Sequence, residues 1–439
     1  MNVAERVRQA GVVGAGGAGF PAHVKVGSQV EYVIANGAEC EPLMHKDAEL
    51  MARHAPEIVA GMQAVMGATG AAKGIIGLKS KHTEAIDALK RATEGSRIEM
   101  KMLGDFYPTG DEFVLVYEAT GRLIPPGGIP LSVGVVVQNV ESLYNVAAAI
   151  DGVPVTRKIL TVAGAVRQPL TCSVPIGITF RELIDLAGGA LTEDYAFFVG
   201  GAMMGQLSRD ADACVTKTTG GLIVLPEHHP LVKHIERPEP DMHQIGKSAC
   251  DQCSYCTELC PRYLLGYQIE PHKVMRSLVF SLSGEGFWSQ WGQLCCECGL
   301  CTLYACPEGL YPREACQRAK QELKSRDADR LDTGETQVKP HPMYDSRHIP
   351  VKQLVRRLGL THYDLPAPFV EVDIRPERIR LPLNQHVGAP AQPVVRPGDR
   401  VAAGDSVAEI PDEALGARIH TSIDGIVREI EPEIVIEAQ

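Results

Sequence analysis

The sequence lacks three features, and each absence argues against a class of protein. No window approaches 18 uninterrupted apolar residues, so no transmembrane helix is expected. The first residues, MNVAERVRQAG, have no apolar signal core, and we therefore expect a cytoplasmic protein. Basic residues are outnumbered, with 43 Lys and Arg against 54 Asp and Glu and a net charge of −11. A nucleic-acid binder that relies on phosphate contacts would need a basic excess, so that class is excluded.

Cysteine is scarce over most of the chain. Only Cys40, Cys172 and Cys214 lie outside residues 250–316, which hold ten of the 13 cysteines. A disulfide scaffold is typical of a short secreted chain, whereas 439 residues suffice for two to four domains. Cysteines crowded into one segment instead indicate metal binding in a reducing compartment.

Residues 1–150 show alternating strand and helix patterns. Short apolar runs predict three buried strands, at 32–35, 74–78 and 133–137. Ile98, Met100 and Met102 alternate as in a further strand. Apolar residues at helical spacing predict helices near 58–65, 85–89 and 143–150. This order favours an α/β domain with a largely parallel sheet and helices on both faces.

Three further units follow this domain. Residues 155–226 carry several predicted strands and one helix over 180–187, which fits a compact α+β module. The stretch 227–243 is rich in proline, histidine and charge and is interpreted as a linker. The cysteine-rich segment covers 245–325. Residues 378–439 have Gly-Asp turns between short apolar alternations, which predicts a small all-β unit.

Two cysteine runs carry the strongest functional signal. The first has the spacing CxxCxxCxxxCP of bacterial [4Fe–4S] ferredoxins, and the second differs only by one extra residue before its last cysteine. In two-cluster ferredoxins the fourth cysteine of a run serves the other cluster. We therefore predict one cluster on Cys250, Cys253, Cys256 and Cys306. The other is predicted on Cys295, Cys298, Cys301 and Cys260.

A pair of structural zinc sites is the alternative interpretation of these runs. Zinc is typically held by two separated CxxC pairs, whereas here three cysteines crowd each run and a proline closes it. The spacing therefore favours iron–sulfur clusters. Cys296 could replace Cys295 only by a register shift, so Cys296 and Cys316 are interpreted as buried thiols.

A glycine-rich loop near the N-terminus matches the pattern GxGxxG, with Glu39 twenty residues further on. A Rossmann dinucleotide loop has this pattern. Two features argue against that interpretation, because the preceding segment is helical in pattern and Pro21 follows at once. A flexible turn is another alternative. The narrower prediction is that backbone amides here can approach a phosphate or ring closely, since no Cβ intervenes.

Polar clusters follow three of the predicted strands, at 36–42, 107–112 and 138–142. Ligands of open α/β sheets bind at the carboxyl ends of strands. Taken singly, each cluster is better explained as a solvated loop or a helix cap, and Ser142 could merely cap its helix. Together with the glycine loop, the three clusters predict one ligand pocket.

These segments together resemble a family of electron-transfer flavoproteins. The motifs are GAGGAGFP at 14–21, NGAECEP at 36–42, YPTGDE at 107–112 and NVES at 139–142. They resemble the FMN- and NADH-binding subunit of respiratory complex I, and more closely the RnfC subunits of Rnf complexes. The closest resemblance is to the PduS family of cobalamin reductases from propanediol-utilising microcompartments, because the segment from 383 onward is C-terminal, as in that family.

The resemblance implies a multidomain α/β architecture. Its parts are a Rossmann-like FMN-binding domain at 1–150, a β-grasp SLBB domain at 155–226, a helical two-cluster ferredoxin domain at 245–325 and a barrel-sandwich hybrid at 378–439. The last part is similar to lipoyl carriers, but its predicted hairpin at 422–425 has no attachment lysine.

The resemblance also implies ligand contacts. The implied flavin contacts are Gly14, Gly16, Gly17, Lys25, Asn36, Tyr107, Gln138, Asn139 and Ser142. The implied nicotinamide-side contacts are Phe20, Glu39, Glu41, Asp111 and Glu112. No side chain is expected to act as a catalytic acid or base.

The implied reaction carries electrons from NADH through FMN and the first and second clusters to an acceptor, for which an oxidised corrinoid is expected. The implied partners are a cobalamin adenosyltransferase and microcompartment shell proteins, with the protein inside or attached to a microcompartment. The alternative is an RnfC-like relay subunit of a membrane-associated NADH:ferredoxin oxidoreductase. A third alternative is a Rossmann dehydrogenase with an accessory ferredoxin.

Overall fold

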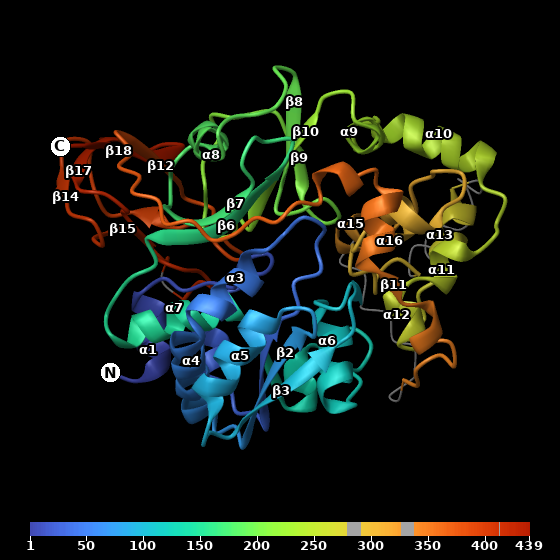
Figure 1. The fold of residues 1–439 in the computed structure, drawn as a ribbon, viewed down its shortest axis with the longest axis horizontal. Coiled ribbons are helices and arrows are strands. Elements are labelled where there is room, and N and C mark those ends of the chain that lie inside the picture. The colour runs from blue at the N-terminus through green and yellow to red at the C-terminus, as the bar shows by residue number, and fades with distance from the viewer. Residues whose placement is uncertain (279–290, 326–337, 412) are drawn as a thin grey trace.

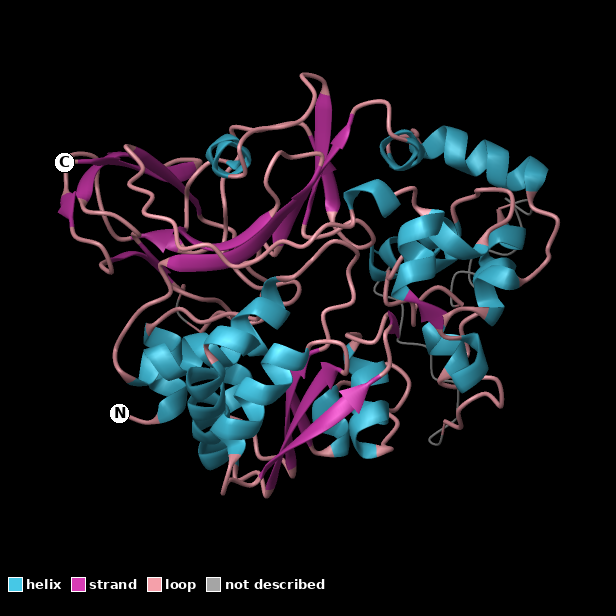
Figure 2. Ribbon diagram, in the orientation of Figure 1, coloured by secondary structure: helices cyan, strands magenta, loops and turns pink. Residues whose placement is uncertain are grey.

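A computed structural model describes residues 1–278, 291–325 and 338–439, with the exception of residue 412. Its α/β domain forms the lower part of the view in Figure 1. A strand-rich module lies above that domain, and Figure 2 separates it by colour from the largely helical cysteine module beside it. In the described ranges no helix is both long enough and apolar enough to cross a bilayer.

The α/β domain is built on a four-stranded parallel sheet of order β3-β2-β1-β5. Its strands are β1 (Tyr32–Gly37), β2 (Lys73–Lys79), β3 (Ile98–Leu103) and β5 (Val135–Asn139). One face is covered by α3 (Lys46–Arg53), α4 (Ala55–Thr69), α5 (Thr83–Thr93) and α7 (Val140–Ile150). The other face packs on α6 (Glu112–Thr120). The predicted strands, helices and two-sided cover are confirmed.

Helices α1 (Val3–Gln9) and α2 (Ala22–Val26) flank the glycine loop. The loop therefore follows a helix, and only an isolated bridge from Val13 to Pro21 stands where a Rossmann strand would lie. This agrees with the helical pattern of the sequence before the loop.

The second module has a mixed five-stranded sheet of order β7-β6-β10-β8-β9 with one helix. Its elements are β6 (Arg157–Gly164), β7 (Leu170–Pro175), α8 (Phe180–Leu186), β8 (Tyr195–Val199), β9 (Gln206–Ser208) and β10 (Gly221–Pro226). The predicted α+β character is confirmed.

The predicted linker at 227–243 is wrong, because two helices, α9 (Pro230–Ile235) and α10 (Glu239–Ala249), occupy it. Proline is favoured in the first turn of a helix, where no backbone donor is needed. His229 caps α9, and acidic residues begin α10, where they complement the helix dipole. The proline and charge that suggested a linker are helix-start signals here.

The cysteine module is helical. It contains α11 (Tyr255–Glu258), α12 (Pro261–Leu264), α13 (Pro271–Ser277), η2 (Cys301–Ala305) and α15 (Pro312–Ser325). The chain then returns to the α/β domain, where β11 (Ile349–Pro350) pairs with β4 (Phe106–Tyr107) and leads into α16 (Val351–Arg357). The sequence patterns did not predict this return.

The C-terminal unit is all-β, as predicted, with strand orders β12-β18-β17-β14 and β13-β15-β16. The strands are β12 (Arg378–Pro382), β13 (Gln392–Pro393), β14 (Arg400–Val401), β15 (Ser406–Glu409), β16 (Ile419–His420), β17 (Gly425–Glu429) and β18 (Glu433–Ala438). It touches the glycine loop, since the amide of Val387 donates to the carbonyl of Ala18 at 3.0 Å.

A test of the helix packing uses two glycines of α4. A Cβ on Gly61 would lie 1.9 Å from the carbonyl oxygen of Leu143 on α7, whereas a Cβ on Gly67 would meet nothing within 4 Å. Gly61→Ala should therefore lower the free energy of unfolding by about 1–3 kcal/mol through overpacking. Gly67→Ala should raise it by about 0.5–1 kcal/mol through helix propensity. Urea unfolding followed by circular dichroism measures both, and equal effects would contradict the close packing.

Candidate functional site

Polar residues stand where two neighbouring parallel strands end. Asn36 on β1 pairs in register with Asn139 on β5. The side-chain oxygen of Asn139 caps α7 by accepting from the amide of Glu141 at 2.9 Å. The Asn36 amide donates to the carbonyl of Gly110 at 3.0 Å, which fixes the loop after Tyr107 at the same edge. The structure thus brings three predicted polar clusters together.

The glycine loop lies against the first turn of α7. The amide of Ala15 donates to Ser142 Oγ at 2.9 Å, and that hydroxyl donates to the carbonyl of Val13 at 3.3 Å. Ser142 therefore joins the loop to the helix, in addition to any ligand contact.

The loop itself is closed by the amide of Gly14, which donates to the carbonyl of Phe20 at 2.9 Å. A Cβ on Gly16 would lie 2.9 Å from Asn139 Nδ2, so a glycine lets the loop approach the strand end. Gly17 is exposed at the tip, and no atom lies within 4 Å of where its Cβ would be. These positions form an open backbone cradle.

Lys25 reaches the same edge from α2. Its ammonium group donates to Glu112 Oε1 at 3.1 Å and to the carbonyl of Val137 at 3.0 Å. It also lies 5.9 Å from the centre of the Phe20 ring. A predicted flavin contact and two predicted nicotinamide-side contacts are therefore neighbours.

Gln138 shows that the pocket has unused hydrogen-bonding capacity. Its side chain is 2% exposed, and its Nε2 donor has no partner within the described ranges. A buried donor without an acceptor costs free energy, which a bound carbonyl or phosphate oxygen would recover. Together with the glycine cradle, this orphaned donor fits a flavin nucleotide.

Two predicted contacts are committed to the cysteine module. Tyr107 is buried, and its hydroxyl donates to the carbonyl of Cys298 at 2.6 Å. Asp111 caps α6 and also accepts from Arg262 at 2.8 Å. Both side chains therefore hold the pocket loop against the cysteine module.

Two predicted acidic contacts differ in their surroundings. Glu41 accepts from the amides of Met203 and Met204 at 2.9 and 3.0 Å, which ties it to the β8–β9 loop. Burial outweighs these amides and raises the pKa of Glu41 to about 7. Burial, followed by the Asp47 carboxylate, raises the pKa of Glu39 to about 8. Glu39 and Glu41 therefore have weaker anionic character than surface carboxylates.

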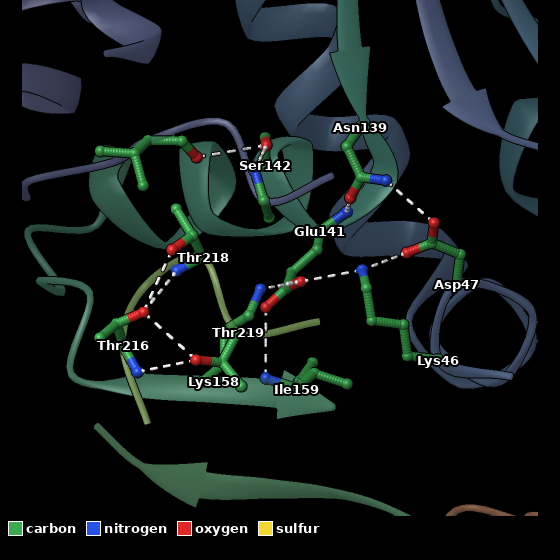
Figure 3. Close-up of polar contacts among 12 residues, drawn as sticks. Lys46, Asp47, Asn139, Glu141, Ser142, Lys158, Ile159, Thr216, Thr218 and Thr219 are labelled. Carbon is green, nitrogen blue, oxygen red and sulfur yellow. Dashed lines mark hydrogen bonds and ion pairs between the residues drawn. The ribbon is translucent and has the colours of Figure 1, made fainter. Parts of the chain in front are cut away.

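A buried ion-pair network lies behind the cradle (Figure 3). Glu141 accepts from Lys158 at 2.5 Å and from Lys46 at 3.1 Å. Lys46 also pairs with Asp47 at 2.6 Å, and Asp47 accepts from Asn139 at 2.9 Å. The network joins α3, α7 and strand β6 of the second module, and its two cations balance its two anions.

The pKa directions follow from this arrangement. Burial alone would raise the pKa of Glu141, but the ammonium groups of Lys158 and Lys46 outweigh it and hold the pKa below its usual range. Burial lowers the pKa of Lys158 despite Glu141. For Lys46 the two carboxylates outweigh burial and raise the pKa. Sequence reasoning missed Lys46, Asp47 and Lys158, since no periodicity marks a buried charge.

The cysteines form two groups of neighbours. Cys256 interacts with Cys250, Cys253 and Cys306, and Cys306 with Cys250 and Cys253. In the other group, Cys260, Cys298 and Cys301 interact with one another and with Cys295 or Cys296. This arrangement supports the predicted exchange of fourth ligands. It also places Cys296 beside Cys298 and the Cys316 thiol beside Cys295, so both interpreted spare thiols border the second group.

The cysteine groups do not have the geometry of a single-ion site. Within the described residues, no three His, Cys, Asp or Glu side chains converge as one metal ion requires. A zinc ion holds its thiolates about 2.3 Å from one centre. A cluster of four irons spreads its ligands further apart, so the wider spacing fits a cluster.

The extra residue of the second run is absorbed in a π-helical turn. Element η2 covers Cys301–Ala305, and the amide of Cys306 donates to the carbonyl of Cys301 at 3.1 Å, five residues back. One inserted residue in a helix is commonly accommodated in this way. The longer gap therefore keeps Cys306 in its group.

Four family models match the chain. They are the Nuo51 FMN-binding domain at residues 7–148, the SLBB domain at 159–207, the 4Fe-4S dicluster domain at 249–311 and the RnfC barrel sandwich hybrid domain at 368–439. These matches confirm the predicted fold class and the flavin and iron–sulfur character of the chain. The dicluster match decides against zinc, and the FMN-binding match decides against a Rossmann dehydrogenase.

Curated relatives cover the whole length. "Cobalamin reductase PduS" of Salmonella typhimurium is 45% identical over 99% of this chain and 95% of its own. The protein of the same name from Citrobacter freundii is 44% identical over 98% and 95%. One component of the proton-translocating ferredoxin:NAD(+) oxidoreductase complex of Clostridium ljungdahlii is 35% identical over 59% and 55%.

Solved structures give a weaker likeness. An NAD+-reducing [NiFe]-hydrogenase in the H2-reduced state matches with a TM-score of 0.50 and 21% identity, over 75% of this chain and 63% of the hydrogenase chain. At this identity the likeness concerns the fold alone.

The buried network gives a stability test. Glu141→Gln should lower the free energy of unfolding at pH 7 by about 3 kcal/mol, because it leaves two buried lysines with one carboxylate fewer. Since the folded-state pKa of Glu141 is depressed, its contribution is present above the unfolded pKa of about 4.3 and is lost as pH falls further. The difference between the two proteins should therefore shrink below about pH 4.

The control for this test is Glu99→Gln, which removes an exposed ion pair with Lys73 at 2.7 Å. Water screens that pair, so urea unfolding should hardly change. A Glu141→Gln effect no larger than the control, or one independent of pH, would show that the network does not stabilise the fold.

Proposed function

The chain belongs to the family of the PduS cobalamin reductases, and we propose that it carries electrons from NADH through FMN and two [4Fe–4S] clusters to an oxidised corrinoid. It is thus an oxidoreductase. The observation that carries this proposal is the 45% identity to a cobalamin reductase over 99% of the chain. The contact between Tyr107 and Cys298 supports it, since it places the flavin-domain pocket beside the cysteine module.

The residues of the pocket have distinct roles in this proposal. When bound, FMN takes a hydride from NADH and passes on single electrons, which suits a one-electron cluster. The loop at Gly14, Gly16 and Gly17 and the α7 residues Asn139 and Ser142 hold the phosphate. Lys25 supplies positive charge near the ring system, and the Gln138 amide donates to a flavin oxygen.

The nicotinamide side of the pocket is formed by Phe20, Glu39 and Glu112. Carboxylates orient a ribose through hydrogen bonds to its hydroxyls. Glu41 and Asp111 shape this side indirectly, because their carboxylates already bind Met203, Met204 and Arg262. No side chain acts as a catalytic acid or base.

The proposal extends to partners and place. A reduced corrinoid is a substrate for adenosylation, so a cobalamin adenosyltransferase is the proposed recipient of the product. Shell proteins of a bacterial microcompartment are the proposed neighbours, with the chain acting inside or attached to such a compartment. The basis is the name of the relatives, which covers cobalamin reduction, and the resemblance of the terminal module to theirs.

A second candidate is a relay subunit like that of a ferredoxin:NAD(+) oxidoreductase complex. It is favoured by the 35% identity to the component of the Clostridium ljungdahlii complex. A relay would pass electrons to a neighbouring protein of its complex and would leave a free corrinoid unreduced.

The test uses the anaerobically purified chain loaded with FMN, iron and sulfide. With NADH and aquocobalamin, we expect the corrinoid spectrum to change to that of the reduced form. The chain loaded with FMN alone should reduce a two-electron dye but reduce the corrinoid at least roughly tenfold more slowly, because single electrons leave through the clusters. Corrinoid that stays oxidised while NADH reduces flavin and clusters would favour the relay. Flavin that NADH does not reduce would overturn both functions.

A further inference from the structure

Two contacts join the flavin-domain pocket to the cysteine module, and both lead to the same cysteine group. The Tyr107 hydroxyl donates to the carbonyl of Cys298 at 2.6 Å. Asp111 pairs at 2.8 Å with Arg262, which lies two residues after Cys260. Cys298 and Cys260 belong to the group of the second run, and their side chains are buried.

The interface around these contacts is closely packed. The Arg262 guanidinium lies 3.4 Å from the centre of the Phe113 ring and also contacts the Cys296 thiol. A cavity of about 10 Å³ is all that remains between Tyr107, Pro261 and Leu300. Such a volume is about the limit for one water molecule, so protein atoms fill the path.

The other cysteine group lies away from this interface. None of its members is bonded to the pocket loop 107–112 within the described residues, and Cys253 is exposed to solvent. Its backbone contacts point to the module's own helices and to α16, where Arg357 donates to the carbonyl of Cys306.

We propose that the cluster held by Cys260, Cys298 and Cys301 with Cys295 or Cys296 is the one that receives electrons from the flavin, with Tyr107 as the residue that positions it. The cluster on Cys250, Cys253, Cys256 and Cys306 then passes electrons to the acceptor near the exposed Cys253. The order of transfer is the reverse of the order of the two runs along the chain. This inference rests on the proposed function only for the identity of the donor and acceptor.

Electron counting is consistent with this order. A hydride from NADH delivers two electrons, and one electron at a time moves to the inner cluster, from there to the outer cluster, and out to a one-electron acceptor such as a cobalt(III) corrinoid. Each transfer oxidises the donor and reduces the acceptor by one electron, and the proton of the hydride is released to solvent. Electron tunnelling weakens steeply with distance, so the cluster bonded to the pocket loop receives electrons first. The buried Arg262 cation beside that cluster stabilises the added negative charge.

The first test compares Cys253→Ala with Cys298→Ala. Each variant should keep its flavin and half of its iron. Electron paramagnetic resonance then follows the remaining cluster after NADH and, separately, after dithionite. In Cys253→Ala, NADH should reduce the remaining cluster as fast as in the wild type. In Cys298→Ala, dithionite should reduce the remaining cluster, but NADH should do so at least roughly tenfold more slowly. The opposite pattern would overturn the proposed order.

The second test keeps both clusters and is available if a cysteine variant does not fold. Tyr107→Phe removes the hydroxyl that contacts Cys298. Tyr267→Phe is the matched control, because the Tyr267 hydroxyl is also buried and also spans the two modules, donating to the carbonyl of Ile124 at 2.6 Å. Tyr107→Phe should shift the resonance signal and midpoint potential of one cluster only and slow its reduction by the flavin. Equal effects of the two substitutions would contradict the positioning role.

The two proposals can fail separately. If NADH leaves the wild-type flavin oxidised, the proposed function fails, and photoreduction of the flavin in the same variants still tests the order. If NADH reduces the flavin but the Cys298→Ala cluster is reduced at the wild-type rate, only the order fails.

Discussion

The buried carboxylate of Glu141 between Lys46 and Lys158 is the interaction on which the site depends. It fixes the first turn of α7 to α3 on one side and to β6 of the second module on the other. The same turn carries Asn139, which meets the strand end, and Ser142, which holds the glycine loop. Because an unpaired buried charge is costly, this turn has little freedom to move. The flavin cradle is therefore preorganised by charges that do not themselves need to touch the flavin.

Several residues that resemble ligand contacts hold modules together. Glu41 is bound by two backbone amides of the second module, and Asp111 and Tyr107 are bonded to the cysteine module. Each of these side chains lies in a loop at the carboxyl ends of the strands, where both a ligand and a neighbouring module can reach it. The shape of the nicotinamide side consequently depends on how the modules dock, which couples the pocket to the clusters without a separate linking element.

The sequence predicted what local spacing controls. Periodicity located β1 and α7, and the cysteine spacing anticipated the two groups, because these signals depend on neighbours within a few residues. The helix at Pro230 was missed because proline marks both linkers and helix starts. The burial of Lys158 and the partner of Tyr107 could not be predicted, since their partners are 17 and 191 residues away and only the packing of modules brings them together.

The extra residue between Cys301 and Cys306 shows why the exchanged ligand arrangement matters. If both cysteines bound one cluster, a longer gap would change the bite of two adjacent ligands on a rigid cubane. They lie instead in different groups, so the segment between them is a bridge. A bridge can lengthen by a π turn, because the hydrogen bond from Cys306 to Cys301 is kept and the closing Cys306–Pro307 corner is still followed by the Leu310 amide, which donates to the Cys306 sulfur at 3.3 Å. The same bridge joins the inner and outer groups, so the insertion falls where the proposed path between clusters needs a fixed connection rather than a fixed ligand spacing.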